Sequence, residues 1–91
     1  MNKILVTYDI PSDKRRKKIC EIMKDYGNHV QYSVFECELT NKYLDIMKKR
    51  IKKFLREKED SFRIYYLSSK EPVVIELGVD RIEKLDGVII I

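Results

Sequence analysis

An apolar run near the N-terminus, followed by apolar residues at helical spacing, predicts a strand and then a helix. An apolar, β-branched run over residues 3–8 stops at Asp9-Ile10-Pro11-Ser12, a group of turn and capping residues. From Ser12, which suits a helix N-cap, apolar residues recur at helical spacing, and Gly27 offers a C-terminal stop. We therefore expect the strand to end at Asp9 and the first helix to run over about 13–26.

The next segment, residues 29–39, is rich in β-branched and aromatic residues and reads as extended. It contains no Asn-Gly or Asp-Gly pair that would mark a tight hairpin. The pattern is compatible with one long bent strand and with two short strands joined around Ser33.

Thr40 can cap a second helix that carries one apolar stripe and one lysine-rich face. The predicted stripe consists of Leu44, Met47, Ile51, Phe54 and Leu55. The lysines between these positions, at 48, 49, 52 and 53, are left to solvent or to a ligand.

After a charged connector over 57–60, apolar runs over 62–66, 73–77 and 88–91 predict further strands. The order strand, helix, extended segment, helix, strand fits an α+β sandwich with both helices on one face of an antiparallel sheet, and a ferredoxin-like βαββαβ fold is the simplest solution. We expect one domain over 1–91. Its C-terminal segment, about 76–91, adds an edge strand that pairs with its own sheet or with a partner.

The length of 91 residues allows one modest core, so burial at a homodimer interface is expected to add stability. The N-terminal apolar run is far too short for a secretory signal or a membrane span, which favours a cytoplasmic protein without membrane contact. Cys20 and Cys37 lack the spacing of a zinc site and are interpreted as reduced, buried thiols.

The net charge of +4 is concentrated in two basic clusters, Lys14–Lys18 and 48–53. Such clusters favour polyanionic partners, RNA or duplex DNA above all. The alternative is that they are the solvated faces of lysine-rich helices.

Asp9 projects a carboxylate from the end of a strand just before a loop. Considered alone, a carboxylate in this position is more often a residue that caps or turns the chain. If a two-fold axis passes near this strand end, two copies of Asp9 could hold a Mg²⁺ that keeps most of its waters. The metal could then activate water for phosphodiester hydrolysis without a protein general base.

Arg15, Arg16 and Lys18 follow Asp9 closely and are candidate phosphate ligands near that metal. His29 is a candidate proton carrier or phosphate ligand, although a lone histidine at a strand start is more often a plain surface residue. Tyr8 and Phe35 could stack on bases, but aromatic residues on strands more often belong to the core.

Several segments together resemble the CRISPR-associated endonuclease two family. They are Val6-Thr7-Tyr8-Asp9-Ile10-Pro11, the basic run at 14–18, the stretch Tyr26–Glu36 with its Val-Gln-Tyr-Ser-Val-Phe-Glu, and Arg63-Ile64-Tyr65 before a terminal apolar strand. The resemblance covers essentially the whole chain and is specific in combination.

The resemblance implies a ferredoxin-like homodimer in which Asp9 of each subunit approaches the two-fold axis as a metal-dependent catalytic carboxylate. It places Tyr8, Arg16, Lys18, Ser33 and Phe35 at positions that the family associates with that site. The sequence departs from the family at His29 and Lys18, where members often carry arginine. The family also acts with the CRISPR integrase, in a complex whose central dimer bridges two integrase dimers and supports duplex DNA.

The sequence is compatible with three functions. The first is a Mg²⁺-dependent endonuclease acting on RNA or DNA through Asp9, and the second is a non-catalytic nucleic-acid-binding adaptor for the integrase. The third is a toxin-like ribonuclease, which shares the dimeric architecture in some families. Fold alone does not choose among them.

Overall fold

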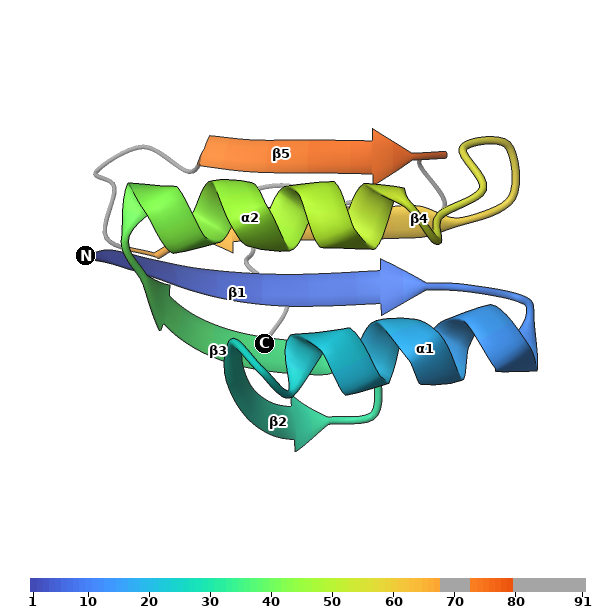
Figure 1. Ribbon diagram of the computed structural model, residues 1–91, viewed down its shortest axis with the longest axis horizontal. Helices are drawn as coiled ribbons and strands as arrows, with labels where there is room; N and C mark the ends of the chain where they lie inside the picture. Colours follow the sequence, from blue (N-terminus) through green and yellow to red (C-terminus); the bar gives the residue numbers. More distant parts are fainter. Residues whose placement is uncertain (68–72, 80–91) are drawn as a thin grey trace.

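Five strands form one antiparallel sheet with two helices packed on the same face, as the computed structural model shows for residues 1–67 and 73–79 (Figure 1). The elements are β1 (Asn2–Asp9), α1 (Asp13–Met23), β2 (Gly27–Gln31), β3 (Val34–Leu39), α2 (Asn41–Lys52), β4 (Ser61–Tyr66) and β5 (Val73–Gly78). The strand order β2-β3-β1-β4-β5 is that of a ferredoxin-like sheet extended by one edge strand. The predicted fold class is confirmed.

Both helices begin where the sequence predicts. The Ser12 hydroxyl accepts a hydrogen bond from the Arg15 N–H, and the Thr40 hydroxyl accepts one from the Tyr43 N–H, each at 3.3 Å. These caps satisfy N–H groups that have no partner inside the helix.

The end of α1 differs from the prediction, since the helix stops at Met23 and residues 24–26 form a turn. Gly27 is a strand residue and not a helix stop. A Cβ at position 27 would overlap the Cys37 sulfur and the Glu36 carbonyl, so the close approach of β2 to β3 requires glycine there.

Residues 29–39 form two strands, joined by a turn at Tyr32 and Ser33. The pairing of β2 with β3 slips between His29 and Gln31, which marks a bulge. The hairpin that the sequence left open is thereby located.

The core lies between the helices and the sheet. Its buried members are Ile4, Val6, Tyr8, Ile10, Ile19, Ile22, Met23, Phe35, Cys37, Leu39, Leu44, Met47, Ile51, Phe62 and Ile64. The predicted stripe of α2 is thus confirmed at three positions, whereas Phe54 lies in the turn beyond the helix and is 39% exposed.

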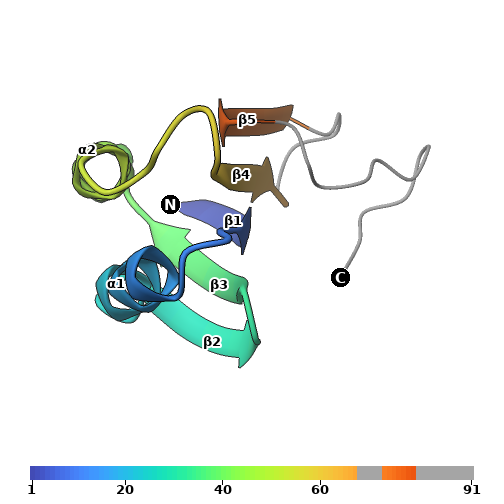
Figure 2. The ribbon, with the colours of Figure 1, turned by 90° about the vertical axis from the view of Figure 1, so that its right-hand side faces the viewer.

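The two faces of the sheet differ, because side chains alternate along each strand. Ile4, Val6 and Tyr8 point to the helices, so Leu5, Thr7 and Asp9 point to the other face. Among the described residues, no helix covers that second face (Figure 2). We call it the open face.

Of the C-terminal segment predicted over about 76–91, only 76–79 fall among the described residues, and the edge strand β5 begins earlier, at Val73. The apolar run 88–91 lies outside them. The helices of the described part are too short and too polar to span a lipid bilayer.

Candidate functional site

Asp9 is the last residue of β1, and its exposed side chain belongs to the open face. Its neighbour Tyr8 points the other way, into the core, as alternation requires. Directly across the ladder, Asp9 faces Ser61, the first residue of β4. The prediction that Asp9 ends a strand and projects from the sheet is therefore confirmed.

Next to Asp9 on the open face lies a buried arginine, Arg63, which the sequence analysis named within the family resemblance but not as a site residue. Arg63 is 2% exposed and stands opposite Thr7 on one side and Glu76 on the other. Its guanidinium donates to the Tyr65 hydroxyl at 3.1 Å and pairs with the Glu76 carboxylate at 3.1 Å. The opposite charges of Arg63 and Glu76, at facing positions of β4 and β5, were the signal in the sequence that could have indicated this pair.

Arg15 is turned toward a partner 45 residues away. Its Nε donates to Asp60 Oδ2 at 2.9 Å and its Nη2 to Asp60 Oδ1 at 3.0 Å, in the two-pronged geometry that favours arginine. A third bond reaches Glu59 at 3.0 Å. The hydrogen bonds and charge of Asp60, followed by those of Glu59, raise the pKa of Arg15, while desolvation opposes them. Arg15 is thus engaged by two carboxylates of its own chain, which makes it less available as a phosphate ligand than the sequence predicts.

Arg16 is held at the loop that directly follows Asp9. Its Nη1 donates to the Ile10 carbonyl at 3.0 Å, and its Nη2 forms an ion pair with Asp13. The side chain stays 44% exposed, so it remains accessible to a ligand. Of the three predicted phosphate ligands, Arg16 is the one placed at this loop.

Lys18 lies elsewhere. Its ammonium sits over the ring of Phe54, 5.1 Å from the ring centre, and therefore faces α2.

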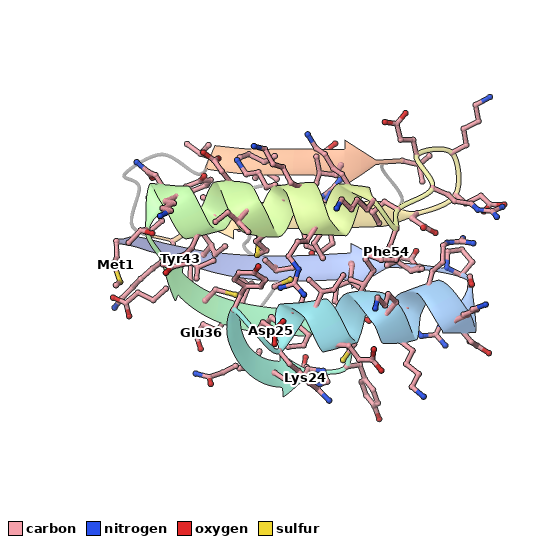
Figure 3. The ribbon with its side chains drawn as sticks, viewed as in Figure 1. Met1, Lys24, Asp25, Glu36, Tyr43 and Phe54 are labelled. Atoms are coloured by element: carbon pink, nitrogen blue, oxygen red, sulfur yellow. The ribbon has the colours of Figure 1, made fainter. Side chains whose placement is uncertain are left out.

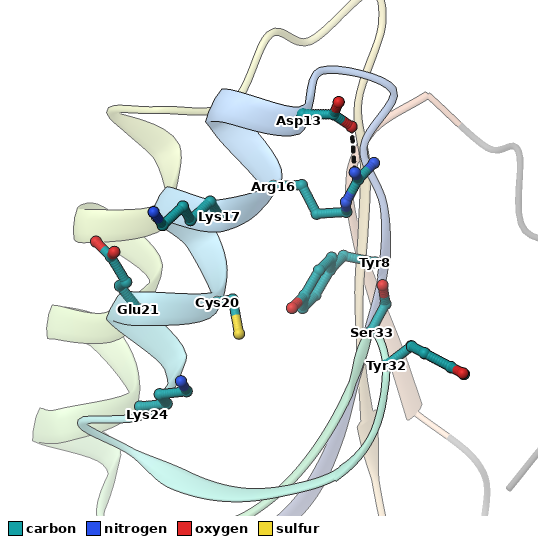
Figure 4. A pocket seen from close by; sticks show the side chains of 9 residues that line it. All are labelled: Tyr8, Asp13, Arg16, Lys17, Cys20, Glu21, Lys24, Tyr32 and Ser33. Atoms are coloured by element: carbon teal, nitrogen blue, oxygen red, sulfur yellow. Dashed lines mark hydrogen bonds and ion pairs between the residues drawn. The ribbon is translucent and has the colours of Figure 1, made fainter.

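A groove of about 420 Å³ opens between α1 and the β2–β3 turn. Figure 4 shows Arg16, Cys20 and Lys17 on the helix side, Ser33 on the turn side and the Tyr8 ring between them. Burial, followed by the neighbouring Cys20, raises the pKa of the Tyr8 hydroxyl, partly offset by Arg16 and Ser33. Tyr8 therefore stays protonated at neutral pH and can donate a hydrogen bond, but it cannot act as a base.

The predicted aromatic contacts to nucleic acid need correction. Phe35 is fully buried, and its ring stacks on Tyr8 on one side and on His29 on the other, at centroid distances of 6.3 Å and 4.5 Å. Because it has no accessible surface, Phe35 cannot stack on a base. The structure shows instead that Phe35 and nearly all of the Tyr8 side chain belong to the core.

His29 is exposed, but it has a local role in the hairpin. Its Nε2–H donates to the Tyr32 carbonyl at 2.6 Å, which helps to close the β2–β3 turn. The carbonyl of Ser33, at the same turn, accepts from the Tyr8 N–H at 3.1 Å and so fixes the turn against β1.

The donor set at Asp9 suits a weakly coordinated hard cation. The described residues contain no cluster of three or more metal-ligating side chains. One accessible carboxylate per chain would therefore fit only an ion that keeps several waters, as Mg²⁺ does, and two copies of Asp9 would fit it better.

These features define a class: a ferredoxin-like α+β protein with an accessible carboxylate at the open-face end of its first strand and a basic helix beside it. The family model described as CRISPR associated protein Cas2 matches residues 1–72. The chain therefore belongs to the Cas2 family.

Individual relatives agree with this assignment. The chain is 39% identical over 88 residues to a Synechocystis protein named CRISPR-associated endoribonuclease Cas2 3, with 96% of each chain covered. It is 40% identical over 80 residues to the CRISPR-associated endonuclease Cas2 2 of Thermus thermophilus, covering 88% of this chain and 86% of that one.

Two crystal structures have the same fold. A hypothetical protein from Thermus thermophilus superimposes with a TM-score of 0.72 at 39% identity, over 87% of this chain and 94% of that one. Streptococcus pyogenes Cas2 superimposes with a TM-score of 0.68 at 38% identity, over 72% of this chain and 86% of that one.

Proposed function

We propose that this chain is a CRISPR-associated endonuclease that hydrolyses phosphodiester bonds with Asp9 as its catalytic carboxylate. The observation that carries the proposal is the position of Asp9, exposed on the open face at the end of β1, one residue before the carbonyl that holds Arg16. The names of the relatives, endoribonuclease and endonuclease, support the same reaction class.

The active unit in this proposal is a homodimer joined through the open face. Val34, Tyr65 and Val74 lie on that face around Leu5; Leu5 is buried, Val34 and Tyr65 are half-buried, and Val74 is 38% exposed. Apolar side chains on a helix-free sheet face suit a second copy of the same surface. An interface with a two-fold axis near the end of β1 would place the two Asp9 carboxylates together.

Asp9 of each subunit would hold Mg²⁺, which when bound supplies an activated water and stabilises charge on the phosphate. The chain's own groups do the rest. Arg16 offers a guanidinium fork to a phosphate oxygen next to the scissile bond. The lysines of α1 add salt-sensitive affinity for the backbone of the nucleic acid without reading its sequence.

Single-stranded RNA is the first substrate to test and duplex DNA the second, because the relatives' names include both endoribonuclease and the broader endonuclease. The Asp9→Asn variant keeps the shape of the side chain and removes its charge. We expect it to lose Mg²⁺-dependent cleavage by more than about 100-fold, since even indirect partners of metal ligands cost about 10- to 100-fold when they are removed.

The matched control is Asp45→Asn, which makes the same chemical change at an exposed position of α2. It should cleave like the wild type. Both variants are first compared with the wild type by sedimentation, so that a change of oligomeric state is not read as a loss of chemistry. Equal cleavage by all three proteins would refute the role of Asp9.

A non-catalytic adaptor for the CRISPR integrase is the second candidate, and the edge strand β5 favours it. Val73 and Val74 are exposed on a strand that has β4 on one side only among the described elements. Such an edge can accept a strand from a partner. An adaptor should still bind nucleic acid after Asp9→Asn, and neutralising Lys14 to Lys18 should weaken that binding and reduce its salt dependence.

A further inference from the structure

Phe54 is an exposed aromatic side chain in a basic environment that the Asp9 site does not use. It lies in the turn that follows α2, is 39% exposed, and sits at the end of α2 where that helix approaches α1 (Figure 3). Lys53 precedes it directly and is exposed as well. The protein covers this ring only in part, so part of it is accessible to a ligand.

The surface of α1 that faces Phe54 is a continuous stripe. Lys14, Lys17, Lys18 and Glu21 are spaced at i, i+3, i+4 and i+7, which places them on one side of the helix. Together with Phe54 and Arg15 they line a groove of about 360 Å³. That volume lies at the small end of ligand sites and suits one nucleotide unit better than a double helix.

The charge of this groove is positive even after its internal ion pairs are counted. Arg15 is engaged by Asp60 and Glu59. The remaining charges are three lysines against the single carboxylate of Glu21. The Lys18 ammonium, 5.1 Å from the centre of the Phe54 ring, is a flexible cation that can move to a phosphate while the ring receives a base.

We propose that this groove is a subsite for single-stranded nucleic acid, in which an unpaired base stacks on Phe54 and the flanking phosphates pair with the lysines of α1. A positive track combined with an exposed aromatic ring is the usual arrangement for binding single strands without sequence preference. A duplex would not use the ring, because its bases are already stacked on one another. The subsite lies on the helix face, and Asp9 lies on the open face.

The proposal requires only that the chain binds nucleic acid, and it does not depend on cleavage. Binding is therefore measured without Mg²⁺, using a short unstructured oligonucleotide that carries the fluorescent base 2-aminopurine. An abasic oligonucleotide of the same length and charge serves as the comparison, because it keeps the phosphates and lacks the bases.

Phe54→Ala should weaken binding of the base-containing oligonucleotide by about 5- to 150-fold, the range found when a stacking aromatic residue is removed. Affinity for the abasic oligonucleotide should stay at the wild-type value. Phe54→Tyr, which keeps a ring, should preserve binding of both. Tyr43→Ala is the matched control, because Tyr43 is an aromatic residue at the opposite end of α2 that is 53% exposed (Figure 3).

A second variant separates stacking from folding. Phe54→Leu keeps an apolar side chain and removes the π-system, so it should show the same selective loss with an unchanged melting temperature. If Phe54→Leu and Phe54→Ala bind both oligonucleotides as the wild type does, the subsite proposal is wrong, while cleavage that depends on Asp9 would still stand. If the wild type binds neither oligonucleotide, the subsite proposal fails together with the proposed nucleic-acid function.

Discussion

Replacing Asp60 by asparagine tests whether one buried carboxylate fixes the start of α1 against the sheet. Asp60 is fully buried in the connector between α2 and β4. Its carboxylate accepts hydrogen bonds from the Arg15 guanidinium and, at 2.9 Å, from the Arg56 N–H. Its carbonyl accepts one from the Val79 N–H at 2.8 Å. Asparagine keeps the size of the side chain but loses the charge and one of its two strong acceptors.

The expected cost follows from burial. Removing one partner of a fully buried ion pair costs about 3–5 kcal/mol. Because the cation is partly exposed and can turn to water, we expect a cost just below that range, about 2–3 kcal/mol. That is a large fraction of the total stability of a domain of this size and corresponds to a fall of about 10–20 °C in melting temperature.

The assay is urea unfolding followed by circular dichroism, with Glu59→Gln as the control. Glu59 is the adjacent residue, binds the same Arg15, and undergoes the same loss of one charge, but its side chain is 53% exposed. An exposed pair contributes at most about 1 kcal/mol, so the control should barely change the midpoint. If the two variants destabilise the protein equally, burial of Asp60 is not what stabilises this junction.

Two further predictions concern stability. Gly78 has a φ of +82°, and a Cβ there would overlap the Asp60 carbonyl, so Gly78→Ala should lower the free energy of unfolding by at least about 1–2 kcal/mol in the same urea assay; an unchanged midpoint would contradict the crowding at this position. Burial, followed by the charge of Glu36, raises the pKa of the Cys37 thiol to about 11. The folded state therefore binds the thiol proton of Cys37 more tightly than the unfolded chain does. The resulting contribution to the free energy of unfolding is intact below about pH 9 and is lost as the pH rises toward 11. Cys37→Ala should therefore lose less stability than the wild type between these pH values, and parallel losses would contradict the assignment.

The fold was predictable where local signals and burial agree. Ser12 and Thr40 mark the helix starts because a hydroxyl there satisfies backbone N–H groups whatever the rest of the chain does. Asp9 ends its strand because the apolar run stops there. The end of α1 was not predictable in the same way, since Gly27 serves a tertiary contact with Cys37 that the local pattern does not contain.

The candidate site was predictable in its central residue and less so in the surrounding ones. Arg15 and Arg16 are neighbours of one type in one basic run, yet one is bound to Asp60 and the other stays half exposed at the loop after Asp9. Only the position of residue 60, far along the chain, separates their roles. Arg63 likewise looks like an outward residue of a strand until β5 brings Glu76 beside it.

The same junction connects the two surfaces that the proposals above assign to nucleic acid. β1 passes into α1 through only three residues, so Asp9 on the open face and the start of the lysine stripe on the helix face are neighbours at one end of the sheet. Arg16 bridges that loop through the Ile10 carbonyl, between the two surfaces. The Arg15–Asp60 pair anchors α1 against β4, whose first residue faces Asp9, and so keeps the two surfaces in a fixed relation.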